Sequence, residues 1–398
     1  MEVGVVGKPN VGKSTLFNAL TLLDVPVAPY PFTTLKPNRG VAAVRVLCPH
    51  AERGGPCTPG NAKCVDGVRW VPVSLIDVPG LVPGAHEGKG LGHEFLDELR
   101  GASGFLQIVD GAGATAPDGV PATPGSFDPA EEVAWLDEEL VAWVTEILSR
   151  DFVRLSKSIE LVGGPVEELL QSRLTGLSIT PGHIAAALRE TPVDRAHPAR
   201  WTDAERRELA RALLRTSKPR WVAWNKADRT TPEKVAELSE RIAPIGSTPT
   251  SAEAELTLRK AQRADLVRYV PGAGSFELVD ADRLNAGQRR ALDEIRTILK
   301  TWGSTGVQAA FERLVFDGLH QIVVYPVEDE QKWTDSKGRL LPDAFLVPVG
   351  TPARAFAYRI HTDLGENFLK AVDARTHRAL AAEHPLESGA VVRIVTRR

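Results

Sequence analysis

A short run near the N-terminus has the residue types and spacing of a loop that holds phosphate groups. It reads Gly7-Lys8-Pro9-Asn10-Val11-Gly12-Lys13-Ser14, with Thr15 next in the chain. In the pattern Gly, four residues, Gly-Lys-Ser, successive backbone N–H groups point at one anion, and the glycines let the backbone approach that anion closely. We expect Lys13 to reach the β- and γ-phosphates and the Ser14 hydroxyl to bind Mg²⁺. The run predicts a nucleoside-triphosphate site.

A second motif is expected to select the base of the bound nucleotide. Asn225-Lys226-Ala227-Asp228 follows the apolar run Trp221–Trp224. The Asp228 carboxylate can accept hydrogen bonds from guanine N1–H and the exocyclic N2–H₂, and adenine offers neither donor there. We expect Asn225 to brace the phosphate loop and the aliphatic part of Lys226 to lie over the base. The motif predicts GTP, because a buried carboxylate left unpaired costs several kcal/mol.

A later loop would complete the base site. It reads Thr250-Ser251-Ala252-Glu253, and the Ala252 backbone N–H is expected to donate to guanine O6.

Two further segments are expected to respond to the γ-phosphate. Asp77 and Gly80 lie in Asp77-Val78-Pro79-Gly80, and we expect Asp77 to hold Mg²⁺ through a water and the Gly80 N–H to contact the γ-phosphate. Thr34 is expected to coordinate Mg²⁺ through its hydroxyl, with Thr33 as the alternative that spacing alone does not exclude. These contacts exist only while the γ-phosphate is present, so hydrolysis would release both segments.

His86 lies in the glycine-rich stretch from Leu81 to Gly92. It would orient the attacking water if that stretch folded inward. The alternative is a solvated loop histidine without a catalytic role.

A separate group of residues has metal-ligand chemistry. Cys48, His50, Cys57 and Cys64 offer three thiols and one imidazole, which is a valid set for structural Zn²⁺. Their spacing is looser than the paired Cys-x₂-Cys of strong zinc motifs. Free buried thiols and a disulfide therefore remain as alternatives.

The elements that must position these residues alternate between strands and helices in the first part of the chain. We predict strands at 3–6, 41–47, 69–76, 105–110 and 221–224, the second and third being antiparallel neighbours. A helix follows the phosphate loop at 15–20. A long helix starts at Asp128-Pro129, with Asp as N-cap and Pro at the first helical position, and further helices follow to about 216.

The last part of the chain no longer shows the strand and helix alternation of the first part. Residues 285–319 are predicted to be helical, and strands at 322–325 and 391–395 bound a small α+β domain. The predicted division is therefore 1–127 and 217–320 for the nucleotide-binding domain, 128–216 for a helical insertion and 321–398 for the last domain.

Composition excludes some classes of protein. With 398 residues, 43% apolar and 25% charged, the chain is expected to form two or three globular domains. It holds no apolar run of eighteen residues, so we predict no transmembrane helix and no membrane partner. Strand formation from residue 3 leaves no room for a signal peptide, and three cysteines form no disulfide framework, so the expected location is cytoplasmic. The net charge of −3 supplies no argument for nucleic acid, and we expect no DNA partner.

Together these stretches resemble the GTPases of the Obg family, nearest to its YchF-related branch. Distinctive segments are Tyr30–Thr34, Pro79–Leu81 and Gly84–Gly92. The block containing Leu340–Ala344 and Ala355–Leu364 resembles the TGS domain. The resemblance implies an α/β P-loop GTPase domain, a mostly parallel sheet with helices on both faces. It also implies an α-helical insertion and a C-terminal α+β ubiquitin-like TGS domain.

The resemblance also implies an activity. Leu81 stands where many GTPases place a water-orienting Gln, so intrinsic hydrolysis of GTP is expected to be slow, on the order of 10⁻⁴ to 10⁻² s⁻¹. Asn10 matches the residue that helps to hold K⁺ near the phosphates in potassium-activated relatives. YchF itself carries a base motif that ends in Glu and is associated with ATP, whereas this chain keeps Asp228. The alternatives are a GTP-dependent scaffold with negligible hydrolysis and a YchF-like ATPase.

The resemblance implies the ribosome or another RNA assembly as partner, reached through the helical insertion and the TGS domain. Within the insertion and just after it, Arg195–Arg220 carries eight Arg/Lys against three Asp/Glu and includes Trp201. This segment is either a surface that contacts RNA or a solvated helix face.

Overall fold

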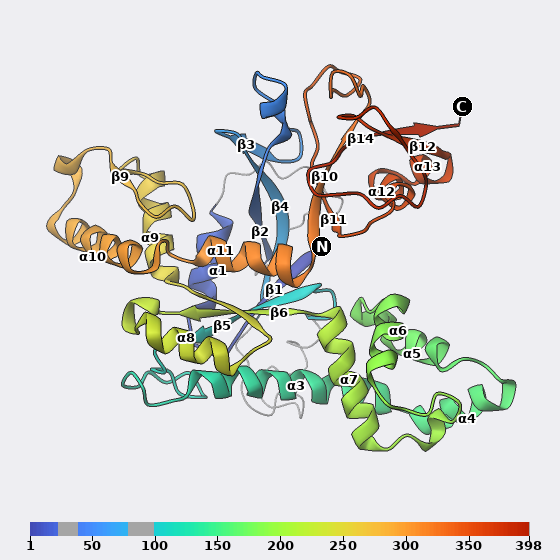
Figure 1. Cartoon of the computed structure of the whole chain (residues 1–398). Coiled ribbons are helices and arrows are strands. Elements are labelled where there is room, and N and C mark those ends of the chain that lie inside the picture. Colours follow the sequence, from blue (N-terminus) through green and yellow to red (C-terminus); the bar gives the residue numbers. More distant parts are fainter. Residues whose placement is uncertain (23–38, 79–98, 398) are drawn as a thin grey trace. The chain divides into compact units, whose positions relative to one another are not determined.

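The computed structural model describes residues 1–22, 39–78 and 99–397 (Figure 1). These residues form two compact units. The first contains mainly 1–20, 75–78 and 99–314, and the second mainly 41–74 and 315–397. Among the described residues, no helix combines the length and the apolar character needed to cross a membrane.

A seven-stranded sheet carries the predicted nucleotide site. Its order is β2-β4-β1-β5-β6-β7, with β3 paired to β4. The pairs β1–β5, β5–β6 and β6–β7 are parallel. Because their carboxyl ends share one edge, residues that follow β1, β5 and β6 come together there. The strands are β1 Glu2–Val6, β2 Arg39–Leu47, β3 Lys63–Val65, β4 Val68–Asp77, β5 Gly104–Asp110, β6 Arg220–Asn225 and β7 Gly246–Pro249.

Helices cover both faces of this sheet, as the predicted fold class requires. Figure 1 shows α1 (Lys13–Thr21) and α11 (Val307–Arg313) along one face, and α3 (Pro129–Ser149) and α8 (Pro232–Arg241) along the other. The centre of the sheet is fully enclosed, since every residue of β5 is buried. The Asp128 side chain accepts a hydrogen bond from the Ala130 N–H at 3.0 Å and caps α3, and Pro129 occupies its first turn.

The helical insertion extends from α3. The first turns of α3 place Ala130 and Val133 on the sheet, and its later turns pack Leu140, Val144 and Leu148 among the following helices. One long helix therefore belongs to the sheet at its start and to the insertion at its end. The following helices are α4 Phe152–Val162, α5 Val166–Leu174, α6 Pro181–Glu190 and α7 Asp203–Ser217.

A smaller subdomain follows β7. Its own apolar core includes Leu258, Tyr269, Leu292 and Ile295. Its elements are α9 Ala252–Arg263, the two-stranded pair β8 Val267–Arg268 and β9 Glu277–Leu278, and α10 Ala286–Trp302.

The C-terminal domain is a five-stranded mixed sheet with a helix packed against it. The order is β11-β10-β14-β12-β13, in which only β10 and β14 are parallel. Phe356 and Ala357 of α12 are fully buried in its core. The elements are β10 Gln321–Val327, β11 Phe345–Pro348, α12 Ala353–Ile360, α13 Thr362–Glu366, β12 Phe368–Asp373, β13 Ala379–Leu380 and β14 Val391–Thr396.

The compact units divide the chain differently from the predicted ranges. Residues 41–74 group with the C-terminal domain as a compact unit, although β2 and β4 within them belong to the seven-stranded sheet, so the predicted domain ranges stay a prediction. A set of hydrogen bonds formed by the segment 48–67, which we call the cysteine segment, contributes to this grouping. The Thr58 N–H donates to Leu340 O at 2.9 Å, and the Asn61 side chain bonds both backbone groups of Ala344. No periodicity in the sequence reports such contacts between distant segments.

Candidate functional site

The loop Gly7–Ser14 curls in the way that its glycines require. Gly7 and Gly12 have φ values of 146° and 101°. A Cβ atom at Gly7 would lie 2.4 Å from the Ile108 carbonyl oxygen, and one at Gly12 would lie 2.3 Å from Nδ2 of Asn225. Both positions therefore exclude a side chain, by conformation and by space.

The Lys13 side chain folds back onto its own loop. Its Nζ donates to the Lys8 carbonyl oxygen at 2.8 Å, and the side chain is buried. Burial lowers the pKa of Lys13, against the opposing charges of Asp77 and Glu132. An anion in the loop would offer this ammonium a stronger partner than a neutral carbonyl.

Ser14 and Asp77 lie side by side. The Ser14 hydroxyl donates to Oδ2 of Asp77 at 2.9 Å. Burial raises the pKa of Asp77, and the Ser14 bond and the Lys13 charge act in the opposite direction. Oδ1 of Asp77 is buried without a hydrogen-bond partner. An unpaired carboxylate oxygen beside a hydroxyl is the hard oxygen set that Mg²⁺ prefers, so these two residues fit this ion.

Asn225 connects the base motif to the phosphate loop. Its Nδ2 donates to the Val11 carbonyl oxygen at 2.8 Å, and its Oδ1 accepts the Ala252 N–H at 3.0 Å. One buried amide therefore ties β6, the phosphate loop and the start of α9 together. Because the Ala252 N–H is already bonded, the expected contact with guanine O6 would have to share or replace that bond.

Asp228 is more open than its predicted role assumed. Its side chain is 35% exposed, and Oδ1 accepts the Ser251 hydroxyl at 2.9 Å. The penalty for leaving Asp228 unpaired beside a wrong base is therefore smaller than for a fully buried carboxylate. Glu253, the other charged residue of this loop, is exposed.

Lys226 belongs to a polar network that sequence reasoning missed. Its backbone is left-handed, with φ 60°, and its Nζ donates to Oδ2 of Asp110 at 2.8 Å and to the Thr115 hydroxyl at 3.0 Å. Burial tends to raise the pKa of Asp110, but the bonds from Lys226 and Thr115 hold it below its ordinary value. The available signal was that Asp110, like Asn225, ends a strand of this sheet.

The loop residue Lys8 is held away from solvent by a second unpredicted partner. Its ammonium lies 2.8 Å from Oε2 of Glu132 and donates to the Thr115 carbonyl oxygen at 2.6 Å. Both charged side chains are less than 10% exposed. Burial raises the pKa of Glu132 to about 6, although the Lys8 charge acts in the opposite direction. The pair anchors the phosphate loop to the first turn of α3.

Asn10 contacts the loop that follows β5. It has φ 63°, and its Nδ2 donates to the Gly119 carbonyl oxygen at 2.9 Å. This contact supplies no support for a K⁺ ligand, and that role stays a prediction. Thr33, Thr34, Gly80, Leu81 and His86 lie outside the described residues.

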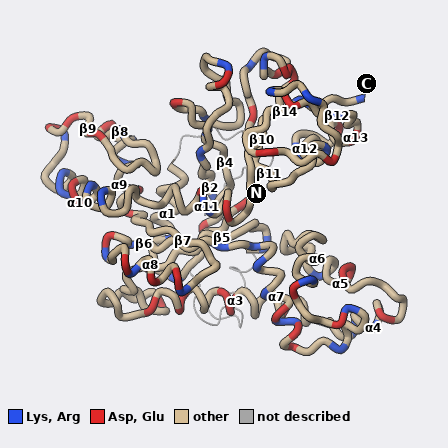
Figure 2. Tube along the Cα trace, viewed as in Figure 1, with Lys and Arg blue, Asp and Glu red and all other residues tan. Residues whose placement is uncertain are grey.

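The basic segment Arg195–Arg220 pairs most of its charges within the fold. Arg207 and Arg211 both bond Glu138, and Arg220 bonds Asp137 at 2.6 Å. Trp201 is 4% exposed and stacks on Phe152. Figure 2 shows acidic and basic residues interleaved along this part of the tube. The solvated-face alternative is therefore better supported than an RNA-contacting surface.

The structure brings Cys48, His50, Cys57 and Cys64 together, with one ligand atom of each within 4.8 Å of the others.

Comparisons with known proteins agree with this geometry. Residues 2–153 match the family model described as 50S ribosome-binding GTPase. Residues 223–329 match the G4 motif-containing domain of YGR210-like Obg-like GTPases, and residues 337–396 match the TGS domain.

Three relatives show how far the similarity extends. A GTP-binding protein of Methanocaldococcus jannaschii is 43% identical over 99% of this chain and 98% of its own. The ribosome-binding ATPase YchF of Haemophilus ducreyi is 35% identical over 39% of this chain and 40% of its own. The crystal structure of a GTP-binding protein from Pyrococcus horikoshii OT3 superimposes with a TM-score of 0.81 at 34% identity and covers 100% of both chains. With its guanine-nucleotide-binding domain and its C-terminal TGS domain, the chain belongs to the YchF-related Obg-like GTPases.

Proposed function

We propose that this protein binds GTP with Mg²⁺ and hydrolyses it slowly to GDP and phosphate. The observation that carries this proposal is the Asn225 amide, which joins the phosphate loop at Val11 to the base motif that ends in Asp228. That link sets the spacing between the phosphate site and the base site. The Asp228 carboxylate matches the two donors of guanine.

The roles of individual residues follow from their positions. The N–H groups of Gly7–Ser14 and the Lys13 ammonium would bind the phosphates. Ser14 and Asp77 would hold Mg²⁺, which neutralises charge on the phosphates when it is bound. The buried network of Lys226, Asp110 and Thr115 would keep the base motif in place.

ATP is the competing ligand, because the relative from Haemophilus ducreyi is named an ATPase. Titration calorimetry with GTP, GDP and ATP, each with Mg²⁺, decides between them. We expect GTP and GDP to bind at least 100-fold more tightly than ATP, since ATP leaves the Asp228 carboxylate without its two donors. A preference for ATP would contradict the assignment of the base.

We further propose that the nucleotide state controls binding to the ribosome, as the name of the same relative suggests. Co-sedimentation of the whole chain with ribosomes should be stronger with a non-hydrolysable GTP analogue than with GDP. Turnover measured with and without ribosomes, each in K⁺ and in Na⁺, tests the activation steps separately. If neither ribosomes nor K⁺ stimulates turnover, the GTP-dependent scaffold becomes the better description.

A further inference from the structure

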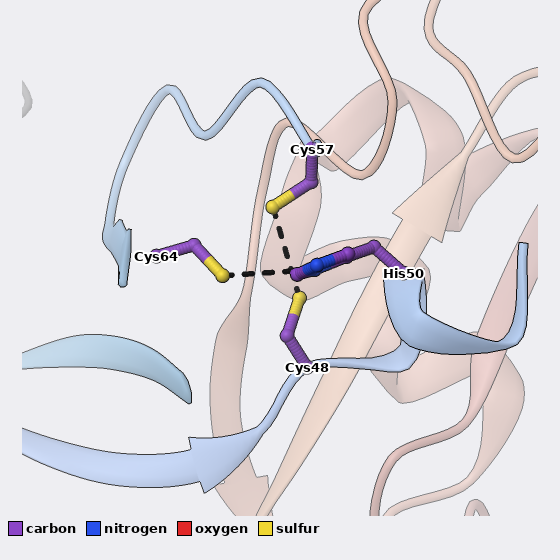
Figure 3. Close-up of side chains that lie close together, drawn as sticks. All are labelled: Cys48, His50, Cys57 and Cys64. Carbon is purple, nitrogen blue, oxygen red and sulfur yellow. Dashed lines mark hydrogen bonds between the residues drawn. The ribbon is translucent and has the colours of Figure 1, made fainter. Parts of the chain in front are cut away.

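Cys48, His50, Cys57 and Cys64 lie in the second compact unit, whereas the phosphate loop lies in the first. Their side chains converge from three places in the cysteine segment (Figure 3). Cys48 and His50 flank Pro49 at the end of β2, Cys57 lies in the following loop and Cys64 lies in β3. Cys48 is buried, and the other three are partly buried.

Two of the separations between ligand atoms match a tetrahedral metal centre, and all of them lie within 4.8 Å. The Sγ atoms of Cys48 and Cys57 are 3.9 Å apart, and Sγ of Cys64 is 3.6 Å from Nδ1 of His50. A tetrahedral zinc ion with Zn–S near 2.3 Å and Zn–N near 2.05 Å requires S···S of about 3.8 Å and S···N of about 3.6 Å. A disulfide would need the two sulfurs at about 2.05 Å, and all three cysteines are free.

A buried cation beside the cluster is the second observation. Arg69, in β4, is 0% exposed, and its Nη2 lies 3.5 Å from Sγ of Cys48. Nη2 also donates to the Leu341 carbonyl oxygen at 2.8 Å, but Nε and Nη1 are buried without a partner. No carboxylate among the described residues lies within ion-pair distance of Arg69, and the Asp343 carboxylate interacts with its charge only at longer range. A buried guanidinium that lacks a directly paired counter-charge is costly.

A bound zinc ion would supply that counter-charge. Three thiolates and a neutral imidazole on Zn²⁺ carry a net charge of −1, which a single guanidinium balances. We propose that Cys48, His50, Cys57 and Cys64 bind a structural zinc ion, and that Arg69 is the buried cation that neutralises the centre. All four positions are filled by protein side chains, so the site is closed and has no position for a substrate.

All four ligands lie within the cysteine segment, so the centre would fix the shape in which this segment contacts the C-terminal domain. This segment contains little regular structure, only the four-residue helix Pro49–Glu52 and the three residues of β3. Its outer contacts are polar or aromatic: Glu52 bonds Arg375 through two hydrogen bonds of 2.8 Å, and the Arg53 guanidinium lies 4.5 Å from the Trp333 ring centroid. A segment with so small an apolar core needs a cross-link, and the metal provides one.

The first test measures metal in the unaltered full chain. The protein, purified without a histidine tag and under reducing conditions, should contain close to one zinc per chain. The three cysteines are the only ones in the sequence, so a mercurial thiol reagent reacts with this cluster alone. It should release zinc in proportion to the number of thiols modified. After removal by a chelator, Co²⁺ should produce the strong visible absorption of a sulfur-rich tetrahedral site, and Zn²⁺ should displace it. Zinc-free protein that takes up neither ion, or a disulfide found by mass spectrometry under the same conditions, would overturn the proposal.

Variants then test the individual ligands. C57S and H50N should each lose most of the zinc, whereas H320N, a substitution of an exposed histidine in the same compact unit, should keep it. Circular dichroism separates loss of a ligand from loss of the fold. Full zinc content in both C57S and H50N contradicts the assignment even if the unaltered chain contains zinc.

The role of Arg69 has its own readout. In competition with a chromophoric chelator, R69M should bind zinc about 10- to 100-fold more weakly, which is the usual effect of losing an outer partner of a metal site. R69K, which keeps the charge, should lose less. Equal affinities of the unaltered chain and R69M would show that Arg69 is not the counter-charge.

Discussion

The base motif places most of its selectivity in one carboxylate. Asp228 is only partly buried and is already oriented by the Ser251 hydroxyl. An Asn at this position would present a donor where guanine N2–H₂ also presents one, and the two would repel. Xanthine carries a carbonyl oxygen at that place and would pair with the amide.

We therefore expect D228N to weaken GTP binding by about 100-fold, since two hydrogen bonds to a charged group are lost. It should bind xanthosine triphosphate more tightly than the unaltered chain does. Fluorescence titration with GTP and with xanthosine triphosphate measures this change of base preference. D228N that keeps its GTP affinity would show that Asp228 does not contact the base, and E240Q, at an exposed acidic residue of α8, is the matched control.

Ser14 supports a second prediction at this scale. Its hydroxyl lies 2.9 Å from Oδ2 of Asp77, and the other carboxylate oxygen is buried and unpaired. S14A should lower GTP affinity by 10-fold or more when Mg²⁺ is present and have little effect when EDTA is present. Binding isotherms with and without Mg²⁺ provide the readout, and T297S, at an exposed hydroxyl of α10, serves as control. Equal losses in both conditions would place the defect in the loop fold and not in metal binding.

At the scale of the elements, the phosphate loop is positioned by what packs behind it. Asn225 holds it from β6, and the Lys8–Glu132 pair holds it from α3. Both contacts are buried, so the loop is fixed by neighbours that lie more than one hundred residues away in the chain.

The Glu132 side chain predicts a pH dependence. Its pKa is raised from 4.5 to about 6 by burial, so between these values the folded chain binds more protons than the unfolded chain. The contribution of Glu132 to the free energy of unfolding is therefore largest below pH 4.5 and decreases as the pH rises to about 6.

Urea unfolding from pH 4.5 to 7 checks this dependence. E132Q does not titrate, so the stability of E132Q relative to the unaltered chain should rise as the pH increases through this window. The control E131Q alters the exposed neighbour in the same helix turn and should show no such trend. A pH-independent difference for E132Q would contradict the raised pKa.

At the scale of the whole molecule, the C-terminal unit joins segments that are more than 250 residues apart in the chain. Asn61 exchanges two hydrogen bonds with the backbone of Ala344, at 3.0 and 2.9 Å, and is 8% exposed. These bonds fasten the cysteine segment to the domain that begins at β10.

We expect N61A to destabilise this unit by about 2 to 4 kcal/mol, because two buried backbone groups lose their partners. Hydrogen exchange should increase at residues 55–65 and 340–346, with little change at the phosphate loop. N367A, at an exposed amide of the same unit, is the control. Unchanged exchange in both peptides would show that these bonds do not hold the segment.

The sequence alone determined the fold class, the nucleotide motifs and the positions of β1, β2, β4, β5 and β6, but it did not predict β3 or β7. The reason is that hydrophobic periodicity, helix-capping residues and glycine positions are properties of short segments. The strand expected at 105–110 is observed as Gly104–Asp110, and the helix expected from Asp128-Pro129 is capped by Asp128. Non-local contacts were decided by tertiary structure. Lys8 forms an ion pair with Glu132, and Lys226 forms one with Asp110. The Arg69 guanidinium contacts Sγ of Cys48 in the cysteine cluster.

The cysteine cluster shows most clearly what could not be predicted from the sequence. Its spacing left zinc, free thiols and a disulfide open, because loop geometry, and not residue order, sets the distance between sulfurs. Only the fold brings the four ligand atoms within 4.8 Å of one another and places a buried guanidinium beside them. The same fold groups residues 41–74 with the C-terminal domain. The sequence could not show this, because the partners of Thr58 and Asn61 are backbone groups almost 300 residues away, and backbone groups carry no sequence signature.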